Sequence, residues 1–153
     1  MKIPQGFISP FTISSGVVLA FTAAAKLVSS FGDAGVLLRP DPIFSISFGH
    51  LFQIAAAVEL GVAAICFFHK NQTLQSALVA VLATNLLLYR LGLYWVGYMG
   101  LCPCLGTLTA DLPVSPEVAE TALDVIVAYL LVGSYAALFL LLRPPKRGFI
   151  RAR

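Results

Sequence analysis

The sequence predicts an all-α integral membrane protein, a bundle of four spanning helices forming a single domain over residues 1–153. Of these residues 59% are hydrophobic and 11% are charged, whereas soluble domains carry about 25% charged residues. The apolar residues also gather into four stretches of about 20 residues, the length that crosses roughly 30 Å of hydrocarbon as a helix. Helices are expected because lipid offers backbone polar groups no hydrogen-bonding partners.

The first predicted span covers residues 11–31. Ser9-Pro10 precedes it, and this pair suits an N-cap followed by a proline in the first helical turn. The second predicted span covers residues 48–68 and holds one acidic residue, Glu59, near its middle. Both stretches are long enough to cross the hydrocarbon core once.

The third predicted span covers residues 74–94, and the fourth covers residues 122–142. Ser115-Pro116 is expected to start the fourth helix before the chain enters the membrane. Between these two spans lies a loop, residues 99–115, that contains a Cys-Pro-Cys run.

The basic residues predict the orientation of the chain. The terminal segments and the connection between the second and third spans hold most of them: Lys2, His69, Lys70, Arg143, Lys146, Arg147, Arg151 and Arg153. The two loops on the other side hold Arg39 and five acidic residues: Asp33, Asp41, Asp111, Glu117 and Glu120. By the positive-inside rule, both termini are cytoplasmic. The basic residues form no stripe interleaved with aromatics, so nucleic-acid binding is not expected.

Four ionisable residues lie inside the predicted spans: Lys26, Glu59, Arg90 and Asp124. A charge at the bilayer centre costs about 2.5–3.5 kcal/mol on insertion scales, so such groups usually face the bundle interior and pair. We expect Glu59 to pair with Lys26 or Arg90. These residues either fasten the helices together, with Lys26 and Arg90 able to snorkel to the interface, or form a polar pocket that moves protons or holds a polar head group.

The second unusual feature is Cys102-Pro103-Cys104 in the loop on the outer side. A disulfide across one residue is geometrically tight, and strained, exposed disulfides are the labile or catalytic ones. Redox exchange at Cys102 and Cys104 competes with a pair of ordinary loop cysteines. A metal site is not predicted, because His50 and His69 fall in or beyond the second span and cannot complete the ligand set.

Several motifs resemble those of one membrane-protein family. They are Ala25-Lys26-Leu27, Asp41-Pro42, Glu59-Leu60-Gly61, Arg90 and, above all, Cys102-Pro103-Cys104-Leu105-Gly106. Together they resemble the MauE/DoxX-like group of small four-helix membrane proteins, the methylamine-utilisation MauE branch in particular. The family pattern after the third helix is similar to Cys-Gly-Cys-Phe-Gly, so Pro103 and Leu105 depart from it.

The resemblance implies thiol–disulfide exchange at the extracytoplasmic face of the bacterial cytoplasmic (inner) membrane. Cys102 and Cys104 would exchange disulfides with a periplasmic thioredoxin-fold protein, aiding maturation of a periplasmic protein. Electrons would pass to or from a membrane carrier such as quinone, and Lys26, Glu59 and Arg90 would form a polar pocket beneath. The resemblance also implies an alternative: a non-catalytic structural or accessory subunit of a larger membrane complex, respiratory or for other electron transfer.

Overall fold

The computed structural model describes residues 5–31, 37–97 and 116–143. Within these ranges it contains four helices and no strand: α1 (Gln5–Ser30), α2 (Phe48–Phe68), α3 (Gln72–Trp95) and α5 (Pro116–Leu142). Each helix is long and apolar enough to cross a membrane. The all-helical class and the four long apolar helices are therefore as the sequence predicts.

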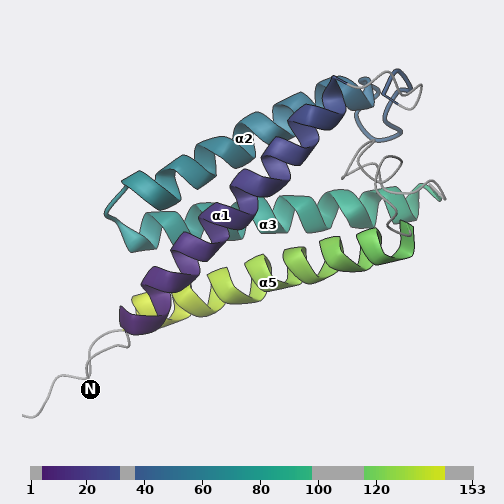
Figure 1. The fold of residues 1–153 in the computed structure, drawn as a ribbon. Coiled ribbons are helices and arrows are strands. Elements are labelled where there is room, and N and C mark those ends of the chain that lie inside the picture. The colour runs from purple at the N-terminus through teal and green to yellow at the C-terminus, as the bar shows by residue number, and fades with distance from the viewer. Residues whose placement is uncertain (1–4, 32–36, 98–115, 144–153) are drawn as a thin grey trace, which may run out of the picture.

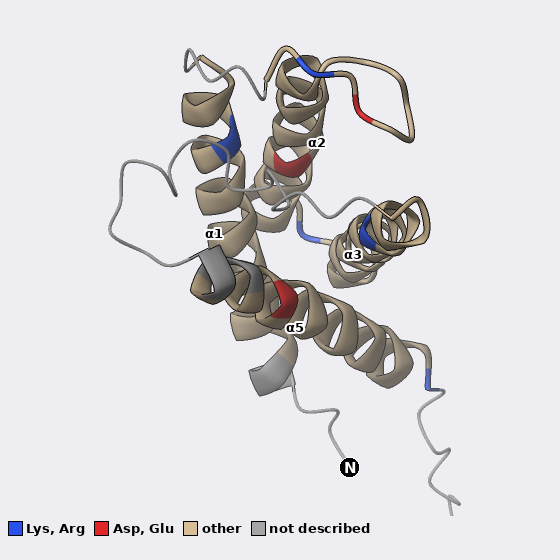
Figure 2. Cartoon of the chain, turned by 90° about the vertical axis from the view of Figure 1, so that its right-hand side faces the viewer, with Lys and Arg blue, Asp and Glu red and all other residues tan. Residues whose placement is uncertain are grey.

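The helices form two pairs (Figure 1): α1 packs mainly on α2, and α3 packs mainly on α5. α1 crosses the other helices obliquely, so that its start lies near the end of α5. We call the end of the bundle that holds residues 69–71, between α2 and α3, the turn end. The opposite end holds residues 37–47, between α1 and α2, and we call it the loop end. Figure 2 shows the bundle from the loop end.

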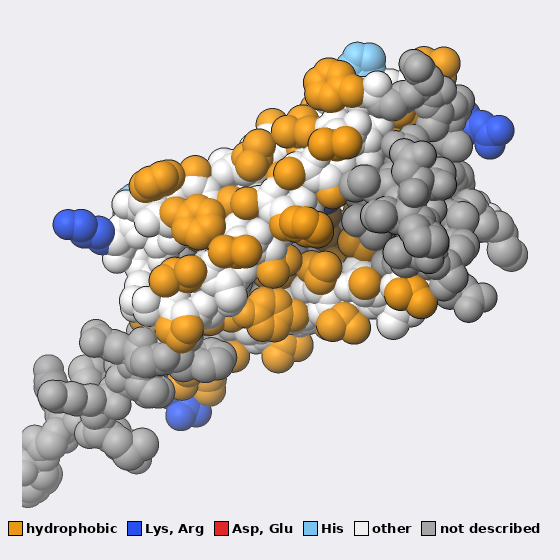
Figure 3. Space-filling model, viewed as in Figure 1, with side chains coloured by type: hydrophobic (Ala, Val, Ile, Leu, Met, Phe, Trp, Pro, Cys, Tyr) orange, Lys and Arg blue, Asp and Glu red, His pale blue; other side chains and the backbone are white. Residues whose placement is uncertain are grey.

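Small residues and a few large apolar side chains fill the interior of the bundle. The largest buried apolar cluster consists of Phe11, Leu19, Val62, Ala63, Cys66, Val79, Ala83, Leu130 and Ala137. Larger apolar side chains, such as Phe21, Val132 and Phe139, point outward and are mostly exposed. Hydrophobic side chains cover the flank of the bundle, and no acidic side chain of the described residues is visible there (Figure 3). Small residues inside and large apolar residues outside are typical of helices that pack within lipid.

The largest difference between the predicted and observed helix boundaries is at the start of α1, while α3 extends from Gln72 to Trp95, slightly beyond the predicted residues 74–94. α2 has the predicted bounds, and α5 begins at Pro116. α1 begins at Gln5, and Pro10 lies inside it, so the prediction of a Ser9 N-cap followed by a first-turn proline is wrong. A proline this close to a helix start removes a single backbone hydrogen bond, and the Thr12 hydroxyl bonds to the carbonyls of Ile8 and Ser9 over the same turn.

The connection between α2 and α3 is short and internally hydrogen-bonded. Asn71 caps α3, its Oδ1 accepting hydrogen bonds from the backbone N–H groups of Thr73 and Leu74. The buried Gln75 amide lies within 2.6–3.2 Å of three carbonyl oxygens at the end of α2, those of Ile65, Cys66 and His69. Side chains of α3 and of its cap residue therefore provide hydrogen-bond partners for backbone groups at the end of α2 and at the start of α3.

Candidate functional site

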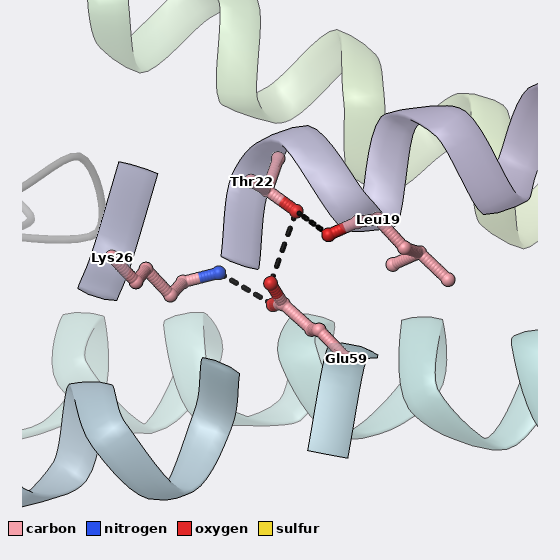
Figure 4. Close-up of polar contacts among 4 residues, drawn as sticks. All are labelled: Leu19, Thr22, Lys26 and Glu59. Carbon is pink, nitrogen blue, oxygen red and sulfur yellow. Dashed lines mark hydrogen bonds and ion pairs between the residues drawn. The ribbon is translucent and has the colours of Figure 1, made fainter. Parts of the chain in front are cut away.

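The centre of the candidate site is an ion pair between α1 and α2 (Figure 4). The Lys26 ammonium nitrogen lies 2.5 Å from Oε1 of Glu59. The Thr22 hydroxyl donates to the other carboxylate oxygen, Oε2, at 3.0 Å, and also lies 3.1 Å from the carbonyl oxygen of Leu19. Thr22 and Lys26 are four residues apart on α1, a spacing that puts both side chains on the face toward α2.

This ion pair is buried on both sides. Lys26 is 6% exposed and Glu59 is 1% exposed. Removing two charges from water is costly, and their attraction offsets that cost only when the geometry is good and further hydrogen bonds satisfy the remaining lone pairs. Thr22 supplies one such bond. Of the two partners expected for Glu59, the structure has Lys26.

Arg90 forms a separate ion pair with Asp124, which joins α3 to α5. This pair is more open, with side-chain exposures of 20% for Arg90 and 68% for Asp124. In Figure 2, basic segments of α1 and α3 and acidic segments of α2 and α5 lie within the helical part of the bundle. Each helix pair is thus fastened by an ion pair of its own.

A small cavity separates the two helix pairs, and Lys26, Glu59 and Arg90 all line it. Its remaining lining consists of Leu19, Thr22, Leu86, Tyr89, Leu123, Ile126, Val127 and Leu130. Its volume is about 40 Å³, which is room for a few water molecules at roughly 10–15 Å³ each. The cavity can therefore hydrate the buried pair, but it is too small for an aromatic ring.

A buried loop carboxylate adjoins this cavity. Asp41, 1% exposed, accepts hydrogen bonds from the backbone N–H groups of Ile43 and Phe44 at 2.8 and 2.7 Å and from the Tyr89 hydroxyl at 2.5 Å. The Phe44 ring also stacks on Tyr89 at 6.1 Å between centroids. The loop end is thereby attached to α3 through Tyr89, which lines the cavity with its ring.

In the sequence, Asp41 stands out only as a loop charge and a residue of the family motif, and Tyr89 does not stand out at all. An aspartate often bonds to backbone N–H groups two and three residues ahead, so Asp41-Pro42 carried a signal for this turn. Nothing in the sequence identifies Tyr89 as the third donor, because that contact joins residues far apart in the chain.

Replacing Tyr89 with phenylalanine is expected to lower the free energy of unfolding by about 1.5–3 kcal/mol, because a hydrogen bond to a charged acceptor is lost. Chemical unfolding in bicelles would measure the change. Tyr94→Phe is the matched control, since Tyr94 lies on the same helix and is 82% exposed. Equal losses in the two variants would show that the bond to Asp41 contributes nothing specific.

Cys102 and Cys104 lie outside the described residues. The segment that holds them leaves from α3, which ends at Trp95, and returns at Pro116, where α5 begins; both points are at the loop end (Figure 1). Cys66 lies in α2 and is buried in the apolar cluster. Among the described residues there is no group of three or more His, Cys, Asp or Glu side chains that could hold a metal ion.

Comparison with protein-family models, with curated proteins and with solved structures finds no match to this chain.

Proposed function

We propose that this chain is a multi-pass protein of the bacterial cytoplasmic membrane, with both termini in the cytoplasm and the loop end outside. The length and apolar character of its four helices support insertion. The described basic residues at the turn end, Lys70 and Arg143, support the orientation by the positive-inside rule. At the loop end, Arg39 is accompanied by Asp41.

We further propose that the chain exchanges thiols and disulfides through Cys102 and Cys104, as the resemblance to the MauE/DoxX-like group implies. One observation supports this proposal: the cysteine segment is joined at both ends to the loop end of the bundle, and the cavity lined by Lys26, Glu59 and Arg90 lies between the helices below that end. Five residues from Gly97 to Cys102 span at most about 18 Å. Arg90 lies five helical residues, about 8 Å, below the end of α3.

The proposed chemistry moves two electrons and two protons. A thiolate of Cys102 or Cys104 attacks the disulfide of a periplasmic thioredoxin-fold protein, a mixed disulfide forms, and the partner's other sulfur leaves as a thiolate. The remaining cysteine then attacks the mixed disulfide, which leaves the partner reduced and the Cys102–Cys104 pair oxidised. A quinol could re-reduce that pair by giving up two electrons and two protons, and the reverse sequence uses a quinone as oxidant. In either direction we assign the holding of a proton to Glu59, whose side chain lines the cavity beside Lys26.

The rival proposal, an accessory subunit of a larger membrane complex, is favoured by one feature of the same site. Lys26 and Glu59 satisfy each other, and the cavity beside them is small, as expected of residues that fasten two helices. The two proposals differ in solution: an accessory subunit carries its neighbours through mild solubilisation, whereas an exchange protein yields them only when a mixed disulfide is trapped.

Substituting serine for Cys102 or Cys104 is expected to abolish exchange, because each thiol is needed in turn. Alkylation mass shifts on intact membranes would report the redox state of the pair. The single-serine variant that keeps the attacking cysteine and lacks the other should trap a thioredoxin-fold protein as a mixed disulfide that reductant releases. The matched control is Cys66→Ala, which removes a buried thiol of α2 and should leave exchange unchanged. Two thiols that remain reduced and trap no partner would contradict the exchange proposal and favour the accessory subunit.

A further inference from the structure

A second pocket lies at the turn end, away from the site described above. It is formed between the first turns of α1 and the connection from α2 to α3, and its volume is about 270 Å³. The residues that line it are Ser9, Thr12, Ile13, Cys66, Phe67, His69, Lys70, Gln72 and Gln75. Thr12, Cys66 and Gln75 are buried and form its floor, whereas Ser9, His69 and Lys70 are exposed at its rim.

The polar groups of this turn-end pocket suit an anion. Lys70 lines the pocket, and none of the lining residues in the part of the chain that the structure describes is Asp or Glu. The His69 Nδ1 accepts a hydrogen bond from the backbone N–H of Asn71 at 3.1 Å, so the neutral ring carries its proton on Nε2 and offers a donor there. The Ser9 hydroxyl and the Gln72 amide add two further donors.

The carbonyl groups that would repel an anion already face a hydrogen-bond donor of the protein. The carbonyl oxygens at the end of α2 carry the negative end of the helix dipole. Three of them, those of Ile65, Cys66 and His69, face the Gln75 amide nitrogen. The N–H groups of Thr73 and Leu74 are occupied by Asn71, so recognition in this pocket depends on side chains and not on the start of α3.

We propose that the turn-end pocket binds a phosphate group, and that the phosphate belongs to the head group of an anionic phospholipid. Two observations assign it to a lipid instead of a free phosphate. The pocket lies at the end of four helices apolar enough to cross a membrane, the level at which head groups lie. Ile13 and Phe67 line the same pocket and are 51% and 45% exposed, which offers apolar contact to the first part of an acyl chain. This inference does not depend on the thiol–disulfide proposal.

The test uses the full-length chain in nanodiscs of phosphatidylcholine and phosphatidylglycerol in equal amounts. Native mass spectrometry would count the phosphatidylglycerol molecules that stay bound, and titration of this lipid in neutral detergent would give its dissociation constant. Lys70→Gln is expected to weaken binding by at least about tenfold, since it removes a hydrogen bond between charged partners. Ser9→Trp, which blocks the rim without changing charge, should weaken it similarly.

Arg143→Gln is the matched control. Arg143 is also at the turn end, but it lies over the Phe139 ring and does not line the pocket. It can contribute only the general attraction of a basic residue to an anionic surface, about fivefold. Equal losses in Lys70→Gln and Arg143→Gln, or full binding by Ser9→Trp, would overturn the proposal. Lys70-dependent binding of inorganic phosphate in pure phosphatidylcholine, with no preference for phosphatidylglycerol, would overturn its assignment to a lipid.

Discussion

Replacing Lys26 with methionine is expected to lower the free energy of unfolding by about 3–5 kcal/mol, because it removes the cation that pairs with the Glu59 carboxylate inside the bundle. Methionine keeps the unbranched shape of the lysine stem, so the loss reports the charge and not the packing. Glu59 is 1% exposed and keeps only the Thr22 hydroxyl as a partner. Equilibrium unfolding in bicelles with an ionic detergent, followed by circular dichroism, measures the difference.

Arg90→Met provides the comparison, because it removes the cation of the other ion pair. Its partner Asp124 is 68% exposed and lies in the first turn of the apolar stretch that begins at Thr121. Exposed ion pairs contribute about 0–1 kcal/mol, so this variant should lose far less stability. Similar losses in Lys26→Met and Arg90→Met would show that burial does not set the strength of the Lys26–Glu59 pair.

Two further variants separate pairing from proton transfer. Lys26→Met combined with Glu59→Met should recover most of the lost stability, since apolar side chains of similar size can replace a buried pair at little cost. Glu59→Gln keeps the shape of the side chain and removes its titratable group. If thiol–disulfide exchange and its pH dependence both survive in Glu59→Gln, Glu59 transfers no proton and only fastens α1 to α2.

The helices could be predicted from the sequence because each is a long apolar run, and the bounds of α2 were found to the residue. The start of α1 could not be predicted, because Pro10 suits a first turn, whereas in the structure it lies one turn further in and costs the helix a backbone hydrogen bond. The ends of an apolar run show where the hydrophobic sequence stops, and the helix itself need not stop there. Helices often extend past that point into polar sequence, as α5 does from Pro116 to Thr121.

The partner of Glu59 could be limited to two residues but not chosen between them. Glu59 shares a buried face of α2 with Phe52, Ala56 and Cys66, so its inward direction follows from helical spacing. The choice between Lys26 and Arg90 depends on which helix lies against that face. Four apolar runs of similar length do not specify which helices pack together. In the structure α1 packs against α2, while α3 packs mainly on α5.

Substituting alanine for Gly133 is expected to destabilise the contact between α5 and α1 by about 1–3 kcal/mol, the usual cost of overpacking a core. A Cβ at this position would lie 2.8 and 2.9 Å from Cζ and Cδ2 of the Phe11 ring and closer still to Cε2. The ring cannot easily give way, because Phe11 is 4% exposed and contacts the Tyr129 ring at 5.6 Å. Glycine is thus required here by the close approach of α1 to α5.

Gly61→Ala is the matched control for this steric effect. A Cβ added at Gly61 meets no atom within 4 Å, so that variant should gain up to about 1 kcal/mol from the better helix propensity of alanine. The opposite signs distinguish a clash from a general effect of losing a glycine. Shortening Phe11 to leucine in the Gly133→Ala background should recover part of the loss, because the branched chain vacates the space that the ring fills. A Gly133→Ala protein as stable as Gly61→Ala would mean that α1 and α5 do not approach each other this closely at Phe11.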